Sequence, residues 1–120
     1  MNDKISLKNM AFYGFHGVHD FERELGQKFY IDIELKTDLT KPGKTDCLED
    51  TIDYVSIYSK IKEIVEKTNF KLLEALSDKI AQEILAFCPD ISEILVRVRK
   101  PGAVINGFFD YVEIEITRKR

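Results

Sequence analysis

The chain has 120 residues, of which 44% are hydrophobic and 32% charged, and its formal net charge is −3. This length suits one domain over residues 1–120, and the composition is typical of a folded globular protein. The slight acidity argues against a nucleic-acid partner, which favours a basic surface. Because no apolar run approaches the roughly 20 residues that span a bilayer, and the first residues do not resemble a signal peptide, we expect a cytoplasmic protein with no membrane partner.

The first half of the chain predicts two strands separated by a loop. Residues 5–15 are apolar and aromatic, which favours a strand, and the glycine-bracketed residues 15–25 predict a structured loop. Residues 27–39 alternate, with Phe29, Ile31, Ile33 and Leu35 on one face and Tyr30, Asp32, Glu34 and Lys36 on the other. This period of two predicts a strand that is covered on one side only. Residues 39–50 contain Pro-Gly and predict a second loop.

The middle of the chain predicts two helices. The first begins after Asp53, a candidate N-cap, and carries apolar residues at helical spacing, namely Ile57, Ile61, Ile64 and Val65. The second carries a similar stripe of Leu73, Leu76, Ile80, Ile84 and Phe87, and Pro89 ends it. The link around residues 69–71 is short, so the two helices should be antiparallel neighbours.

Two further strands, within residues 91–100 and 109–120, complete the order ββααββ. This order favours an α+β fold, an antiparallel four-stranded sheet with both helices on one face. The other face is charged and carries Asp32, Glu34, Arg97, Arg99, Glu113 and Glu115. These charges either pair across a solvated face or line the lumen of a closed barrel, which would form if the open sheet edges paired between subunits.

Several side chains outside these stripes could carry chemistry. His16 and His19 lack further ligands at metal-binding spacing, so we interpret them as hydrogen-bonded loop residues and predict no metal site. Cys47 and Cys88 have no ligand-like spacing and are interpreted as reduced thiols. Tyr54 lies in line with the stripe of the first helix, which predicts a core position.

Two carboxylates each allow two interpretations. Glu22 lies in the charged run 20–24, for which a solvated turn is the default, although a loop carboxylate beside a pocket is the alternative. Glu74 falls in the first turn of the second helix, where the helix dipole favours a negative charge. It could simply stabilise that helix, or it could accept two parallel hydrogen bonds from the N–C–N edge of a heterocycle.

Lys100 occupies an unusual place for a lysine. By strand parity it shares the apolar face with Val96 and Val98, which is costly unless its amine reaches solvent. A partly desolvated lysine there is suited to proton transfer. Gln27 holds the matching position at the start of its own strand and could meet Lys100 or a ligand.

Together these segments resemble the dihydroneopterin aldolase family. The resemblance runs through FYGFHGVHDFERELGQKFYIDIEL (residues 12–35), DTIDY (50–54), LLEALSDKIA (72–81), VRVRKPGAV (96–104) and FDYVEIEITR (109–118). It implies the tunnelling fold, in which four ββααββ subunits close a barrel ring and two rings commonly stack into an octamer. After Lys100 the chain departs from the proline-rich pattern of many relatives, and Val104 and Asn106 should make this loop more flexible.

The resemblance implies a folate-pathway lyase that uses a small-molecule pterin. Retro-aldol cleavage of 7,8-dihydroneopterin would give 6-hydroxymethyl-7,8-dihydropterin and glycolaldehyde, with side epimerisation to dihydromonapterin. The substrate's own C=N bond can accept the electrons of the breaking C–C bond, so no cofactor is expected and the protein supplies acid–base catalysis and positioning. The alternatives are a dihydroneopterin triphosphate epimerase, which a retained Glu22 disfavours, and a non-catalytic oligomeric pterin-binding protein.

The resemblance also implies a role for individual residues. Catalytic roles fall to Lys100 near the ring imine, to Tyr54 as a proton shuttle and to Glu22, which orients the side-chain hydroxyls. Glu74, assisted by the backbone of Leu73, would bind the amino-pyrimidinone edge, and Gln27 would support the lysine. Thr51, Ile52 and Asp53 match a segment that a neighbouring subunit lends to the pocket, which implies a homo-oligomer with active sites between subunits.

Overall fold

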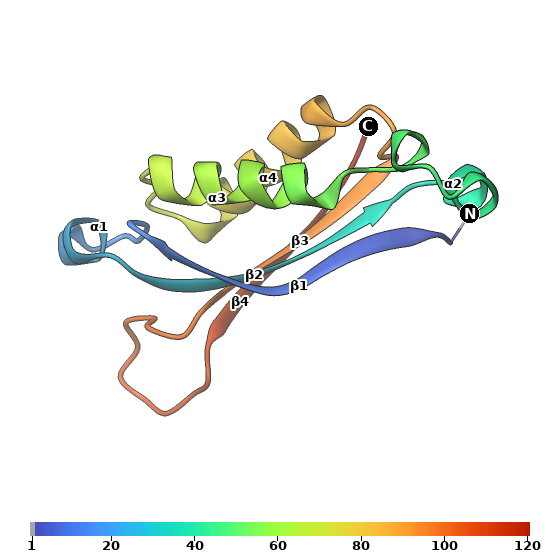
Figure 1. The fold of residues 1–120 in the computed structure, drawn as a ribbon. Coiled ribbons are helices and arrows are strands. Elements are labelled where there is room, and N and C mark those ends of the chain that lie inside the picture. The colour runs from blue at the N-terminus through green and yellow to red at the C-terminus, as the bar shows by residue number, and fades with distance from the viewer. Residues whose placement is uncertain (1) are drawn as a thin grey trace.

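The computed structural model describes residues 2–120. In chain order it contains β1 (Lys4–Gly14), α1 (Asp20–Leu25), β2 (Gln27–Lys36), α2 (Thr40–Thr45), the 3-10 helix η1 (Leu48–Asp50), α3 (Tyr54–Lys67), α4 (Leu73–Phe87), β3 (Glu93–Lys100) and β4 (Val112–Lys119). The strands form one antiparallel sheet in the order β1-β2-β3-β4, with α3 and α4 on one face (Figure 1). The predicted four-stranded sheet with two covering helices is therefore confirmed.

The core lies between the sheet and the two long helices. The apolar face of β2, the apolar face of β3 and the helical stripes meet there, and their side chains are fully buried, as in Phe29, Ile31, Ile33, Leu35, Val96, Val98, Ile61, Leu76, Ile80 and Ile84. Helix α3 packs on β1, whereas α4 packs on β3 and β4. The period-two and helical patterns therefore place the apolar residues as expected.

The opposite face of the sheet carries a network of cross-strand ion pairs. Arg99 donates to both carboxylate oxygens of Asp32, at 2.8 and 2.9 Å, and Arg97 donates to Glu34 at 2.9 Å. The hydrogen bonds from Arg99 lower the pKa of Asp32 to about 2, and bonds chiefly from lysines lower the pKa of Glu34 to about 2. The predicted pairing across adjacent strands is confirmed, while a barrel lumen on this face stays a prediction.

Three local predictions were wrong. Residues 15–25 contain the six-residue helix α1, and residues 39–50 contain α2 and η1, because such short helices show no apolar stripe that a sequence pattern could reveal. The side chain of Phe87 is 49% exposed, since Ile84 and Leu85 take the core side of the last turn of α4.

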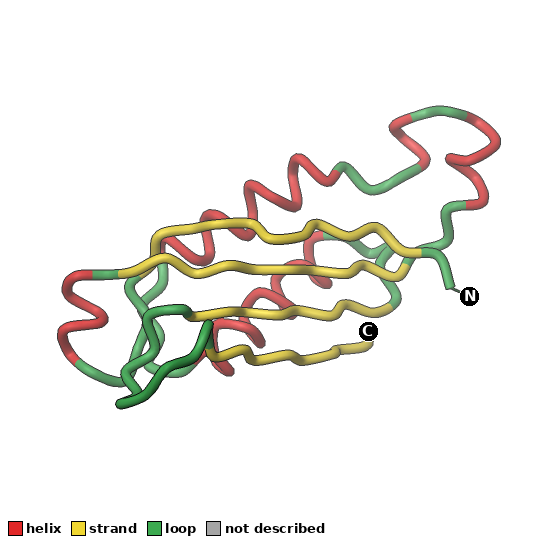
Figure 2. Tube along the Cα trace, turned by 90° about the horizontal axis from the view of Figure 1, so that it is seen from below, coloured by secondary structure: helices red, strands yellow, loops and turns green. Residues whose placement is uncertain are grey.

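The molecule is elongated, with extents of 52 × 26 × 22 Å, and its sheet has two distinct ends. Gly14, Gln27, Lys100 and Val112 lie at one end, and Lys4, Lys36, Glu93 and Lys119 lie at the other. Helix α1 extends beyond the first end of the sheet. The 101–111 loop joins β3 to β4 at this same end, and it lies on the side of the sheet away from α3 and α4 (Figures 1 and 2). Within residues 2–120, no helix combines the length and apolarity needed to cross a membrane.

Candidate active site

Lys100 is the last residue of β3, and its side chain turns into the protein. It is 9% exposed, and its Nζ atom lies 2.5 Å from Oε2 of Glu22. The predicted placement on the apolar face is confirmed. The lysine avoids an unpaired buried charge by meeting a carboxylate, and its amine does not reach into solvent.

Glu22 is brought to this lysine by the short helix α1. It is the third residue of the helix, and its Oε1 accepts the backbone N–H of the N-cap residue His19 at 3.3 Å, as in a capping box. A Cβ atom on Gly17 would lie 2.5 Å from Cδ of Glu22, so this close approach requires a glycine. The side chain is only 4% exposed, and the default interpretation of a solvated turn is wrong.

Gln27 completes the cluster from the first residue of β2. Its Nε2 donates to Oε2 of Glu22 at 3.0 Å, so the amide and the ammonium of Lys100 meet at the same carboxylate oxygen. A Cβ atom on Gly102 would lie 2.6 Å from Oε1 of Gln27, so a larger residue there would displace the Gln27 amide. We call Lys100, Glu22 and Gln27, together with the start of α4, the lysine end.

The electrostatics of the lysine end keep the carboxylate ionised. Burial alone would raise the pKa of Glu22, but hydrogen bonds from Lys100, Gln27 and the His19 amide outweigh it, so the pKa is lowered. Glu22 is therefore ionised at neutral pH. A held ammonium beside an oriented carboxylate can deliver a proton to a ring nitrogen and fix a hydroxyl group of a bound molecule.

The start of α4 lies at this same end of the sheet. The N–H of Gly17 donates to the carbonyl of Phe70 at 2.9 Å, which ties the loop that leads to Glu22 to the link that precedes α4. Leu73 is 8% exposed, whereas Glu74 in the first turn is exposed. An ionised carboxylate beside the free N–H groups of a helix start can bind a heterocycle edge that donates two hydrogen bonds.

The remaining predicted residues lie at the opposite end of the sheet, in the segment from Thr51 to Val55, which we call the tyrosine end. Asp53 is the N-cap of α3, as predicted, and accepts the N–H of Val55 and the hydroxyl of Ser56 at 3.0 Å each. Ile52 is buried, whereas Tyr54 is 59% exposed, so its predicted core position is wrong. Tyr54 stands on the first turn of α3, and the core begins one turn later at Ile57.

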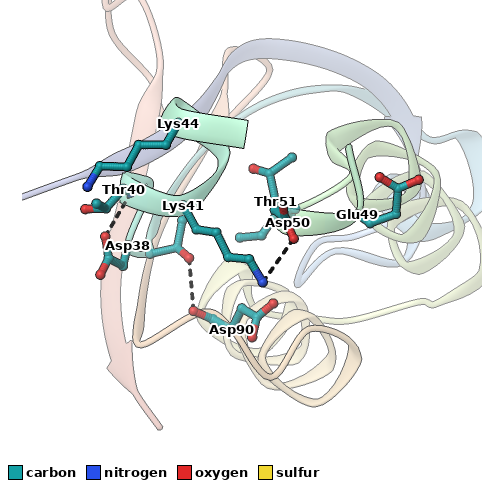
Figure 3. A pocket seen from close by; sticks show the side chains of 10 residues that line it. Asp38, Thr40, Lys41, Lys44, Glu49, Asp50, Thr51 and Asp90 are labelled. Carbon is teal, nitrogen blue, oxygen red and sulfur yellow. Dashed lines mark hydrogen bonds and ion pairs between the residues drawn. The ribbon is translucent and has the colours of Figure 1, made fainter. Parts of the chain in front are cut away.

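Two hollows open at the tyrosine end. The smaller, of about 300 Å³, is lined by Ile5, Leu48, Thr51, Ile52, Asp53, Tyr54 and Val55. The larger, of about 660 Å³, is polar, and across it Lys41 pairs with Asp50 at 3.2 Å (Figure 3). Of the predicted functional residues, only Thr51 and Ile52 line the larger hollow, so we assign it no chemistry.

The two ends are far apart within one subunit. The tyrosine end borders Ile5, which pairs with Leu35, and Leu35 lies eight residue steps along β2 from Gln27. At about 3.3 Å per residue this is roughly 26 Å. The structure therefore gathers Lys100, Glu22, Gln27, Leu73 and Glu74 at one end, and it leaves Thr51, Ile52, Asp53 and Tyr54 at the other.

Sequence reasoning missed two residues that shape the lysine end. The interpretation of His16 as a hydrogen-bonded loop residue is confirmed. The sequence did not indicate that the ring is fully buried and uses both of its nitrogens in hydrogen bonds. Gly102 provides the room for Gln27. The position of His16 between two glycines was the available signal, whereas the contact of Gly102 depends on tertiary structure alone.

Comparisons with known proteins agree with one another. The family model described as dihydroneopterin aldolase matches residues 5–117. Dihydroneopterin aldolase from Bacillus subtilis is 43% identical over 98% of this chain and 98% of its own. The crystal structure of Escherichia coli dihydroneopterin aldolase in complex with neopterin superposes with a TM-score of 0.88 at 28% identity, covering 97% of this chain and 98% of that one. The crystal structure of Burkholderia thailendensis dihydroneopterin aldolase bound to guanine superposes with a TM-score of 0.81 at 26% identity. The match covers 98% of this chain and 91% of that one.

Proposed function

This chain belongs to the dihydroneopterin aldolase family, and we propose that it cleaves 7,8-dihydroneopterin into 6-hydroxymethyl-7,8-dihydropterin and glycolaldehyde. The resemblance seen in the sequence is confirmed by the family match and by the relatives. The observation that carries the assignment to this chain is the buried pair of Lys100 and Glu22, which lies at the same end of the sheet as the exposed Glu74 in the first turn of α4.

Glu74 is proposed to bind the substrate ring. Its carboxylate lies where helix N–H groups and the helix dipole favour a negative charge, and it can accept two hydrogen bonds from an amino-pyrimidinone edge. Neopterin and guanine, which the Escherichia coli and Burkholderia structures contain, both carry this edge. The shared edge supports a pterin as the small-molecule partner, with the backbone of Leu73 assisting.

The remaining residues are proposed to move protons while the ring stores electrons. A base removes the proton of the side-chain hydroxyl, the adjacent C–C bond breaks and the electron pair flows to the ring C=N bond. Glycolaldehyde leaves, and the resulting enamine is protonated on carbon to give the hydroxymethyl product. Lys100 is proposed to deliver a proton to the ring nitrogen, and Glu22, held by its hydrogen bond from Gln27, to orient the side-chain hydroxyls. Tyr54 is proposed to shuttle a proton.

We infer that the complete site lies between two subunits of a homo-oligomeric ring, as a tetramer or a stacked octamer. The lysine end and the tyrosine end lie at opposite ends of β2, with Gln27 and Leu35 roughly 26 Å apart along the strand, so a neighbour would supply Tyr54 with Thr51, Ile52 and Asp53. The edge strands β1 and β4 are free to pair with other copies. Each copy would contribute one domain, residues 1–120.

Epimerisation to dihydromonapterin is proposed as a side reaction, because re-addition of the enamine to the opposite face of the glycolaldehyde carbonyl needs no further group. An epimerase specific for the triphosphate is the weaker candidate, since the ionised Glu22 would repel a polyanion. We propose that the reaction takes place in the cytoplasm, and the two free cysteines support a reducing compartment.

A product assay tests this function. Purified protein would be incubated anaerobically with 7,8-dihydroneopterin, beside a reaction without protein, and the products would be separated by chromatography. We expect glycolaldehyde and 6-hydroxymethyl-7,8-dihydropterin in equal amounts, with a smaller peak of dihydromonapterin. A stereoisomer as the sole product would instead indicate an epimerase, and unchanged substrate would contradict both activities.

A further inference from the structure

We propose that His16 is a positioning residue that holds the Glu22–Lys100 pair and the start of α4 in register, an inference that rests on the proposed function. His16 follows β1 and is fully buried. Its Nδ1 accepts the backbone N–H of Phe70 at 3.0 Å, and its Nε2 lies 2.8 Å from the carbonyl oxygen of Val65. One side chain thus joins the first loop to both the end of α3 and the link before α4.

These two contacts fix the chemical state of the ring. Because Nδ1 accepts a hydrogen bond from an N–H group, the proton of the neutral imidazole lies on Nε2, which donates to the Val65 carbonyl. Burial lowers the pKa of His16, with a smaller opposing effect from the Val65 carbonyl, and this favours the neutral form. The ring also packs against Phe29 and Phe70, with centroids 5.4 and 6.0 Å away.

On its own segment, His16 leads directly to the catalytic cluster. Its carbonyl oxygen lies 3.5 Å from Nε2 of Gln27, the amide that also donates to Glu22. The next residue, Gly17, donates to the carbonyl of Phe70 and packs against Glu22. A shift of His16 would therefore be transmitted to the carboxylate that pairs with Lys100.

On the other side, the contact of His16 with Phe70 sets the start of α4. Only Lys71 and Leu72 separate Phe70 from Leu73 and Glu74, so this bond fixes the backbone that presents the ring-binding carboxylate. The distance between Glu74, which binds the heterocycle, and Lys100, which moves its proton, is therefore set through the buried ring of His16. A misplacement of about 1 Å between such groups can cost about 100-fold in rate.

Two variants separate the two bonds of His16. In His16→Asn the side-chain oxygen can reach the place of Nδ1 and accept the N–H of Phe70, while the bond to Val65 is lost. In His16→Gln the amide nitrogen can reach the place of Nε2 and donate to Val65, while the bond to Phe70 is lost. Both variants remove the ring, and the shorter Asn leaves the larger cavity, so a loss confined to His16→Gln cannot be due to cavity size. Ile84→Val provides a cavity at the distant end of α4 as a control.

The measurements are the KM and kcat for 7,8-dihydroneopterin, the dissociation constant for guanine and the melting temperature. We expect His16→Gln to raise KM and the guanine dissociation constant about 10-fold, the value of one lost hydrogen bond, while His16→Asn stays within about 3-fold of wild type. Ile84→Val should lower the melting temperature without changing the KM or the guanine dissociation constant.

Two results would overturn the inference in distinguishable ways. If wild type cleaves dihydroneopterin and both His16 variants bind guanine as wild type does, or lose affinity equally, His16 supports the fold only and the proposed function stands. If wild type neither cleaves dihydroneopterin nor binds guanine, the function itself is wrong and the positioning role falls with it.

Discussion

The lysine end and the tyrosine end hold their functional side chains in opposite ways. At the lysine end, Glu22 and Lys100 are 4% and 9% exposed, and each finds its charge partner within the same chain. At the tyrosine end, Tyr54 is 59% exposed beside Leu48 and Val55, which are 67% and 64% exposed. A charge buried within one chain is costly unless that chain also supplies its partner, whereas a group of exposed apolar side chains is typical of a surface that another molecule covers. This contrast supports the proposed shared site, in which one copy supplies the lysine end and a second copy supplies the tyrosine end.

The largest expected effect comes from breaking the lysine end. Lys100→Ala should lower kcat by about 10²- to 10⁴-fold, because a positioned proton-transfer group is lost, and it should also destabilise the fold by leaving Glu22 buried without its partner. Steady-state kinetics and urea unfolding measure the two effects. The exposed Lys28, at the same end of β2, provides the control Lys28→Ala. A kcat within a few-fold of wild type in Lys100→Ala would remove the lysine from the chemistry.

The next largest effect separates ring binding from catalysis at the same end. Glu74→Ala should weaken the binding of guanine by about 10- to 100-fold, since hydrogen bonds to a charged group are worth about 1.5–3 kcal/mol. The free energy of unfolding should change little, because Glu74 is exposed. Calorimetric titration measures the affinity, with the exposed Glu63→Ala on α3 as the control. Equal affinity in Glu74→Ala and wild type would refute the assigned role.

A smaller effect tests how tightly the lysine end is packed. In Gly102→Ala the new methyl group would meet Oε1 of Gln27 at 2.6 Å, so the flexible amide should shift away from Glu22. We expect kcat to fall about 5- to 10-fold through this misplacement, with no further loss when Gln27→Ala is added. Gly107→Ala, where a Cβ atom meets nothing within 4 Å, is the matched control. Additive losses in the double variant would show that Gly102 acts independently of Gln27.

The smallest effect on activity is expected between the two ends, at Asp32. Its pKa is about 2 in the folded chain and 3.8 ordinarily, so its contribution to stability is complete above pH 4 and is lost as the pH falls through 2. Asp32→Asn should cost about 2 kcal/mol at pH 7 and much less near pH 2, with kcat almost unchanged. Urea unfolding over this range measures the difference, with the exposed Asp110→Asn as the control. A cost that does not vary with pH would contradict the ion-pair explanation.

The pattern of apolar residues was sufficient to predict the sheet and the two long helices. The period of two in β2 and β3 placed Lys100 on the core face because parity along a strand is a local property. The same logic failed for α1 and α2, since a helix of six residues is too short to show a stripe. It also failed for Tyr54, because a stripe shows which face of a helix is apolar but not where the neighbouring core begins.

The site depends on contacts that no local pattern contains. Glu22 looked like part of a solvated charged run, and its burial follows from Lys100, which is distant in sequence and arrives from another strand. The resemblance supplied the set of functional residues, including Thr51, Ile52 and Asp53 as a neighbour's contribution. The structure adds that Tyr54 lies with that segment, near the end of the sheet opposite Gln27.

The measurement that tests the shared site most directly uses mixed subunits. Lys100→Ala and Tyr54→Ala chains, each inactive alone, would be unfolded together in equal amounts and refolded. A site is intact only where a Tyr54→Ala copy supplies the lysine end and a Lys100→Ala copy the tyrosine end, so we predict about one quarter of wild-type activity. Wild type mixed equally with the double variant should also give about one quarter, whereas a site within one chain would give about one half. No recovery in the first mixture and one half in the second would contradict a site built from two subunits.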